Sequence, residues 1–275
     1  MRRRFKASPL GRATLSDLLS GRVAVVTGAN RGLGRAIAEG MAAAGAWVAA
    51  CARDPSSLTD LGPAIERLGG RFLGLGCDVT DQVSVEAMAS TVLQEWGKVD
   101  VVVANAGIAG AVQPLHQLTY QEWRECIATD LDGVFLTFRP FIADMIARGG
   151  GSLIAISSGT GKKPLANRTP YCAAKMGVIG LVRSLALEVG PSGVRVNSVC
   201  PGAVDGERLT RIVMKDAADR GISESDSLSQ FTVGAALKRT LQPDEVASAC
   251  VFLASDLSAG ITGEDLNVSA GLIMY

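Results

Sequence analysis

The sequence is poor in clustered metal-binding side chains. It contains one histidine, His116, and its cysteines form no CxxC pair. A zinc site needs a close set of such ligands, so we expect no metal. The cysteines lie mostly in apolar segments, at Cys51, Cys77, Cys126, Cys172, Cys200 and Cys250. We interpret them as reduced, small hydrophobic residues of a cytosolic protein.

Net charge is also lacking, because 27 basic residues balance 27 acidic ones. Proteins whose main partner is nucleic acid or an anionic membrane usually carry a basic excess. We therefore expect neither partner.

Long apolar runs are absent, and no stretch approaches the roughly 20 residues of a membrane span. The segment "MRRRFKASPLGRATL" resembles a twin-arginine signal only faintly. Pro9, Gly11, Arg12 and Asp17 interrupt the apolar run of about 7 to 15 residues that a signal peptide needs. We interpret residues 1–20 as a disordered basic N-terminal extension and predict a cytoplasmic protein.

From residue 21 onward, short β-branched runs alternate with longer helical ones. Strands are expected near residues 22–28, 47–53, 71–81, 99–107, 151–158, 194–202 and 260–271. Most are apolar throughout and separated by helices, a pattern typical of a parallel sheet covered on both faces. Residues 119–149 are expected to form one long helix, and residues 203–242 an irregular stretch. The sequence predicts an α/β protein: a single doubly wound Rossmann domain over residues 21–275, with a seven-stranded parallel sheet.

A glycine-rich turn, "TGANRGLG", follows the first strand and opens the first helix. Gly28, Gly32 and Gly34 would let the backbone approach a pyrophosphate, which a helix N-terminus attracts. The spacing is GxxxGxG instead of the commoner GxGxxG, and a tight strand–helix connection is the simpler alternative. Placement in the first strand–helix turn favours a dinucleotide site.

The charge after the second strand bears on which dinucleotide is bound. An NAD site usually carries an acidic residue about 20 positions beyond the glycines. Here Ala52 and Arg53 occupy that region, and Arg31 adds a second cation. Each arginine alone could be an ordinary surface charge. Together they predict NADP(H) preferred over NAD(H), since guanidinium groups suit a 2′-phosphate.

The segment "YCAAK" places Tyr171 and Lys175 four residues apart on a predicted helix, so both side chains lie on one face. By itself this pair could be a tyrosine at the core edge with a lysine reaching past it to water. The preceding predicted strand ends in Ser157 and Ser158. Ser158 lies thirteen residues before Tyr171.

In this order, "TGANRGLG", "CDVT", "ANAG", Ser158, "YCAAK" and "CPGAV" resemble the motifs of the classical short-chain dehydrogenase/reductase family. The likeness runs from about residue 21 to the end. It implies cofactor contacts from Thr27, Gly28, Asn30, Arg31, Gly32, Leu33, Gly34, Arg53, Asp78, Val79, Asn105, Ala106, Gly107, Tyr171, Lys175, Pro201, Gly202 and Val204.

The resemblance also implies the chemistry. Tyr171 would be the general acid/base at the oxygen of a carbonyl or secondary alcohol substrate, while hydride passes to or from the nicotinamide. A free phenol titrates near pH 10, and Lys175 would favour its phenolate and bind the cofactor's ribose. Ser158 would hold the substrate oxygen, whereas Ser157 should point elsewhere.

One departure falls within the predicted catalytic set. The family usually has asparagine in the middle of the long helix, where this sequence has Asp130 in "DLDG". The family's asparagine kinks the helix and helps to hold a water linked to the lysine. An aspartate adds negative charge near Lys175, which puts the pH optimum in question more than the chemistry.

The substrate is left open by the sequence. Residues 203–230 take the place of the family's substrate lid, where Arg208 and Arg211 are expected to form a solvated face. With the lid arginines Arg208 and Arg211, the residues Lys162, Lys163 and Arg168 would form a basic rim that suits a carboxylate or a phosphopantetheine arm. Two alternatives to a small-molecule oxidoreductase are a 3-oxoacyl-(acyl carrier protein) reductase and a non-catalytic NADP(H)-binding regulator. The family's habit of pairing its long helices between subunits implies a homotetramer or homodimer.

Overall fold

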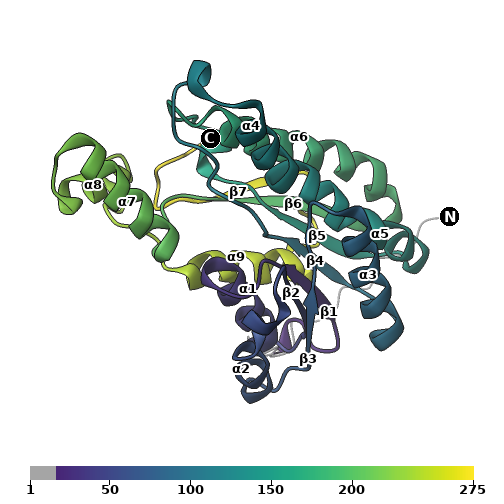
Figure 1. Ribbon diagram of the computed structural model, residues 1–275. Coiled ribbons are helices and arrows are strands. Elements are labelled where there is room, and N and C mark those ends of the chain that lie inside the picture. The colour runs from purple at the N-terminus through teal and green to yellow at the C-terminus, as the bar shows by residue number, and fades with distance from the viewer. Residues whose placement is uncertain (1–16) are drawn as a thin grey trace.

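The computed structural model describes residues 17–275, which form a parallel sheet between two layers of helices (Figure 1). Seven strands occur in the order β3-β2-β1-β4-β5-β6-β7. They are β1 (Val23–Thr27), β2 (Trp47–Ala52), β3 (Phe72–Gly76), β4 (Val101–Ala104), β5 (Gly151–Ile156), β6 (Val194–Pro201) and β7 (Asp265–Val268). The predicted fold class is confirmed.

The central strands are buried on both faces, which explains their continuous apolar sequences. In β1 all five residues are buried, and Ala24 pairs with Val48 of β2 and Val101 of β4. The order of the strands reverses at β1, so the carboxyl ends of β1 and β4 lie at the switch point where α/β proteins of this kind bind ligands.

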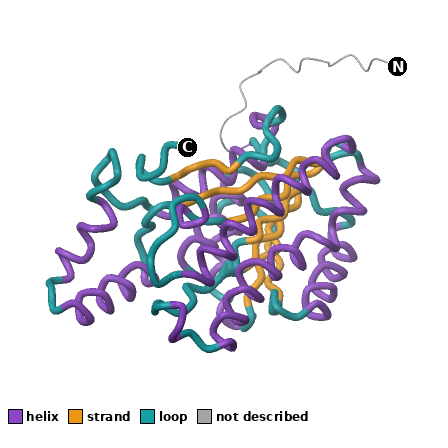
Figure 2. The backbone as a smooth tube through the Cα atoms, turned by 90° about the horizontal axis from the view of Figure 1, so that it is seen from above, coloured by secondary structure: helices purple, strands orange, loops and turns teal. Residues whose placement is uncertain are grey.

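Helices cover the two faces separately, as Figures 1 and 2 show. One face carries α1 (Gly32–Ala43), α2 (Leu61–Arg67) and α9 (Pro243–Ala254), and the other carries α3 (Gln82–Trp96), α4 (Tyr120–Ile127), α5 (Gly133–Arg148) and α6 (Thr169–Val189). Short 3₁₀ helices span Pro55–Leu58, Leu115–Gln117, Gly159–Gly161, Gly190–Ser192 and Asp256–Ser258. Fully buried side chains such as Phe138 and Phe141 each contribute about 1.5–3 kcal/mol to folding.

The expected long helix is interrupted by a widened turn. A π-helical segment, Ala128–Asp132, separates α4 from α5 and contains Asp130. Such segments form where a helix accommodates an extra residue, often at functional sites. The helix also begins with a capping box, in which Thr119 and Glu122 satisfy each other's backbone N–H groups.

The stretch expected to be irregular is largely helical. It forms α7 (Glu207–Arg220) and α8 (Glu224–Thr232), which lie together beside the layered body (Figure 1). Leu209, Val213 and Ala217 are spaced by four residues and are buried. This apolar stripe on an otherwise polar helix explains why the segment folds on the body and why its composition hid it.

The predicted N-terminal extension is only partly testable, because residues 1–16 lie outside the described part of the chain. Residues 17–20 differ from the expectation. Leu19 is fully buried, and its backbone N–H donates to the carbonyl of Ala44 at 2.8 Å. In residues 17–275, no helix is both long enough and apolar enough to cross a membrane.

Candidate active site

The glycine-rich turn after β1 leaves its backbone accessible to a ligand. Gly28 and Gly32 have φ angles of +65° and +52°, which other residues rarely adopt. A Cβ at Gly34 would overlap the carbonyl oxygen of Gly28, so the turn and α1 pack at the closest possible distance. The first turn of α1 contains no acidic side chain, and its free N–H groups therefore suit an anion.

Asn105 and Thr27 fasten this turn to the end of β4. The Asn105 amide donates to the carbonyl of Thr27 at 2.8 Å, and the Thr27 hydroxyl accepts the N–H groups of Asn105 and Ala106 at 3.1 Å each. Asn30 and Leu33 complete the turn, with Leu33 packed on the core. Asn105 is thus a residue that shapes the predicted cofactor site.

The two arginines predicted to bind a 2′-phosphate lie in the glycine-rich turn and just after β2. Arg53 is exposed just beyond β2, and Arg31 Nη1 lies 3.5 Å from Glu207 Oε2 of α7. Asp78 accepts hydrogen bonds from the Thr80 N–H and hydroxyl at 2.9 and 2.8 Å. The Thr80 backbone bond chiefly lowers the pKa of Asp78, opposed by partial burial, with help from the Thr80 hydroxyl and the Arg53 charge.

Four further predicted cofactor contacts lie in two places: Val79 follows β3, and Pro201, Gly202 and Val204 lie at and after the end of β6. Val79 is buried, and a Cβ at Gly133 would lie 2.9 Å from its side chain, so Val79 packs against the start of α5. The segment after β6 lies beyond the carboxyl end of that strand. There Pro201 ends the strand, the Gly202 N–H donates to the carbonyl of Val268 at 2.9 Å, and Val204 pairs with Leu241.

Tyr171 and Lys175 lie on one face of α6, as their spacing predicts. The Lys175 ammonium is 5.7 Å from the centroid of the Tyr171 ring and donates to the carbonyl of Ile156 at 3.0 Å. Lys175 is 3% exposed, so its charge is held in place instead of reaching water. This burial argues against the simpler interpretation of a lysine that extends into solvent.

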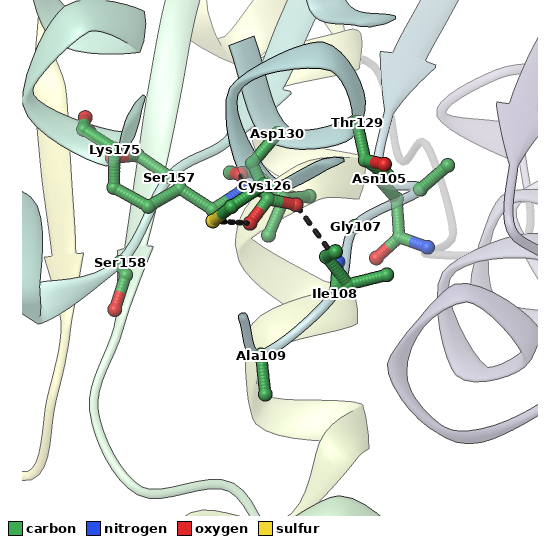
Figure 3. Close-up of polar contacts among 12 residues, drawn as sticks. Asn105, Gly107, Ile108, Ala109, Cys126, Thr129, Asp130, Ser157, Ser158 and Lys175 are labelled. Carbon is green, nitrogen blue, oxygen red and sulfur yellow. Dashed lines mark hydrogen bonds and ion pairs between the residues drawn. The ribbon is translucent and has the colours of Figure 1, made fainter. Parts of the chain in front are cut away.

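The two serines after β5 have different surroundings (Figure 3). The Ser157 hydroxyl is buried and donates to the carbonyl of Lys175 at 2.9 Å, which joins α6 to the sheet. The Ser158 hydroxyl is half-buried and accepts the Thr160 N–H at 3.1 Å. Ser158 is therefore the more exposed of the two serines, and its role at the substrate oxygen stays a prediction.

Asp130 lies at the centre of the site and is fully buried. Its Oδ1 accepts the Ile108 N–H at 2.8 Å and lies 3.9 Å from Lys175 Nζ, while the Cys126 thiol donates to Oδ2 at 3.7 Å (Figure 3). A Cβ at Gly107 would be 2.5 Å from Oδ1, so only glycine fits beside the carboxyl group.

Burial raises the pKa of Asp130 above its ordinary value of 3.8, although the Lys175 charge and the Ile108 bond oppose the shift. Burial, with the Asp130 charge, also raises the pKa of Cys126 to about 12, so this thiol stays protonated. The folded protein therefore binds the Asp130 proton more tightly than the unfolded chain. This carboxyl contributes stability below about pH 3.8, and that contribution is lost as the pH rises through the folded-state pKa.

Two arginines that the sequence placed on the surface reach into the site. Arg208 of α7 donates from Nη2 to the carbonyl of Gly107 at 2.6 Å. Arg168 is buried, donates to the carbonyl of Ala109 at 2.9 Å, and has its guanidinium carbon 4.7 Å from the Tyr171 ring centroid. Its position one helical turn before Tyr171 was the only sequence signal for this contact.

The expected basic rim is therefore formed only in part. Lys162 Nζ lies 2.6 Å from Asp265 Oδ2 and is largely buried, and Arg168 is buried against the Tyr171 ring. The other three rim residues, Lys163, Arg208 and Arg211, are exposed. Ion pairing and burial removed two of the five charges from the surface.

The fold agrees with comparisons to known proteins. A family model described as enoyl-(acyl carrier protein) reductase matches residues 28–273. A 3-oxoacyl-[acyl-carrier-protein] reductase of Vibrio harveyi is 38% identical over 256 residues, which cover 93% of this chain and 99% of the relative. D-threitol dehydrogenase of Mycolicibacterium smegmatis is 37% identical over 254 residues, covering 92% of this chain and 93% of the relative.

Among solved structures, a single-residue variant of actinorhodin polyketide ketoreductase with NADPH superposes with a TM-score of 0.88 at 32% identity. The match covers 92% of this chain and 98% of the ketoreductase chain. The fold and these matches define an oxidoreductase acting on carbonyl and alcohol groups. The chain belongs to the short-chain dehydrogenase/reductase family, which confirms the family predicted from its motifs.

Proposed function

We propose that the protein is an NADP(H)-dependent oxidoreductase that transfers a hydride between the nicotinamide and a carbonyl or secondary alcohol substrate. The observation that carries the proposal is the buried Lys175 ammonium, held 5.7 Å from the Tyr171 ring at the carboxyl ends of the strands. This arrangement suits proton transfer at a substrate oxygen.

The residues around the switch point fit a dinucleotide with a 2′-phosphate. Gly28, Gly32 and Gly34 would face the pyrophosphate at the start of α1, and Arg31 and Arg53 would face the 2′-phosphate. Asp78 would bind the adenine, and Pro201, Gly202 and Val204 would lie beside the nicotinamide. Bound NADP(H) supplies or accepts the hydride.

The protein's own groups would manage the proton and the substrate oxygen. Tyr171 would give or take the proton, and Lys175 would favour its phenolate by opposite charge. Ser158 would donate a hydrogen bond to the substrate oxygen as charge develops there. Asp130 would act through Lys175, because its Oδ1 lies 3.9 Å from the ammonium.

A mutational test separates this role from a structural one. Tyr171→Phe should reduce turnover of a ketone panel with NADPH by about 100-fold or more, the usual contribution of general acid–base catalysis. NADPH binding, followed by nicotinamide fluorescence, should persist. Tyr120→Phe is the matched control, since Tyr120 is 78% exposed on α4. Undiminished turnover in Tyr171→Phe would refute the assignment.

A 3-oxoacyl-(acyl carrier protein) reductase is the second candidate, and the 38% identical relative of that name favours it. The engagement of Lys162 and Arg168 leaves less positive charge for a phosphopantetheine arm than the sequence suggested. Comparing 3-oxoacyl thioesters with free ketones in the same panel decides between the two. Binding of NADPH without turnover of either class would instead indicate a non-catalytic regulator.

Assembly as a homotetramer or homodimer is part of the same proposal. Large apolar side chains are exposed on α5 and α6, among them Phe135 (51%) and Leu187 (81%). Exposed apolar patches of this kind commonly mark subunit interfaces. The cytoplasmic location remains a prediction from the sequence.

A further inference from the structure

Arg168 is a buried cation in direct contact with the proposed acid/base. The residue is 9% exposed, and its guanidinium carbon lies 4.7 Å from the centroid of the Tyr171 ring. Arginine is rarely buried to this extent unless it is paired. Here its hydrogen bond runs from Nη2 to the carbonyl of Ala109, at 2.9 Å.

The charge of Arg168 lacks a counter-ion in the described part of the chain. Across residues 17–275, no carboxylate oxygen lies within 4.0 Å of its nitrogens, and its buried Nε has no hydrogen-bond partner. An unpaired buried cation is unfavourable, and a nearby anion relieves that cost. A phenolate at Tyr171 would be such an anion.

Charged and titratable groups approach the site from several elements. They are Arg168 at the N-cap of α6, Lys175 on α6, Asp130 on the π-helical segment, Cys126 on α4 and Arg208 on α7. Cys126 is neutral. Arg208 is exposed and donates its hydrogen bond to the carbonyl of Gly107. An ionised Asp130 would cancel much of the Lys175 charge, which leaves Arg168 as the uncompensated cation against the ring.

We propose that Arg168 is a positioning residue that stabilises the phenolate of Tyr171. Its positive charge compensates for the part of the Lys175 charge that Asp130 neutralises. The inference rests on the proposed function of Tyr171. Asp130 and Arg168 then act as a compensating pair, and neither substitution alone should preserve the titration of the phenol.

A purely structural alternative is available, because the bond to Ala109 also ties the start of α6 to the loop after β4. The two explanations differ in what they predict for titration. A tether would change stability or overall rate, whereas a charge effect moves the pH at which Tyr171 ionises.

The sequence makes a direct measurement feasible, since it has only three tyrosines. Tyr120 and Tyr275 are 78% and 72% exposed. In a Tyr120→Phe/Tyr275→Phe background, the phenolate absorbance of the cofactor-free protein reports Tyr171 alone. This readout requires no turnover, so a failure of the proposed function is seen separately, as a Tyr171→Phe variant that keeps its activity.

In that background, Arg168→Gln should raise the titration midpoint by about one pH unit, the effect of losing a nearby opposite charge. Asp130→Asn should lower it by a similar amount, and the double variant should return close to the parent. Arg168→Lys keeps the charge and should stay nearer the parent than Arg168→Gln. Should Arg168→Gln not fold, the Asp130→Asn and Arg168→Lys titrations still test the proposal.

Arg195→Gln is the matched control, because Arg195 is a partly buried arginine at the amino end of β6, remote from the site. It should leave the midpoint unchanged even if it lowers thermal stability. The same order of midpoints should appear in the rising limb of alcohol oxidation against pH. An unchanged or lowered midpoint in folded Arg168→Gln, or equal midpoints for the Gln and Lys variants, would overturn the proposal.

Discussion

The exposure of the two arginines sets the expected size of the preference for NADPH over NADH. NADPH should bind more tightly than NADH if Arg31 and Arg53 bind the 2′-phosphate, as we propose. The Arg31 side chain is 65% exposed, so each contact is screened and contributes on the order of 1 kcal/mol. Two such contacts, strengthened by phosphate geometry, correspond to a preference of about 10- to 100-fold.

Glu207 provides a sharper version of the same test. Its Oε2 lies 3.5 Å from Arg31 Nη1, so it competes with the phosphate for that arginine. The Glu207 side chain is 74% exposed, and such pairs are worth less than about 1 kcal/mol. Glu207→Gln should therefore tighten NADPH binding only about two- to five-fold and leave NADH binding unchanged.

The assay is a fluorescence titration of the protein with NADPH and NADH at low and high ionic strength. The preference should shrink as salt rises, because exposed ion pairs are screened. Arg53→Asp should narrow or reverse it, whereas Arg139→Gln, an exposed arginine on α5, should not. Equal binding of the two cofactors by the parent, or a preference insensitive to salt, would refute the two-arginine explanation.

Three other predictions concern the site and the assembly. Asp130→Asn should move the rising limb of alcohol oxidation to lower pH. Its urea unfolding midpoint should rise relative to that of the parent as the pH increases above about 3.8, because the parent's buried carboxyl then loses its stabilising proton; identical profiles would exclude Asp130 from the proton path. Gly34→Ala should cost about 1–3 kcal/mol and weaken NADPH binding, since the added methyl overlaps the Gly28 carbonyl; calorimetry showing neither loss contradicts the close packing. Phe135→Glu/Leu187→Glu should yield a 28.5 kDa monomer by light scattering if α5 and α6 form the interface, and a parent that is itself monomeric would rule out the assembly.

Much of the fold was available from local pattern. Continuous apolar strands alternating with helices predict a parallel sheet covered on both faces. The glycine-rich turn was predictable at Gly28, Gly32 and Gly34, because the conformation of a turn depends on the residue type at each of its own positions. The lid segment was predicted, but its helices were not, because its polar composition hides the buried stripe of Leu209, Val213 and Ala217.

The sequence by itself determined the family and the seven-stranded parallel sheet, and it predicted Ser158, Tyr171 and Lys175 as a catalytic set. Those inferences depend on residue identity and spacing along one chain. Only the tertiary structure decided that Asp130 is buried 3.9 Å from Lys175, that Lys162 pairs with Asp265, and that Arg168 lies against Tyr171. The physical reason is that the effect of a charge depends on its burial and its nearest partner. Both are set by segments that are distant in the sequence and adjacent in the fold.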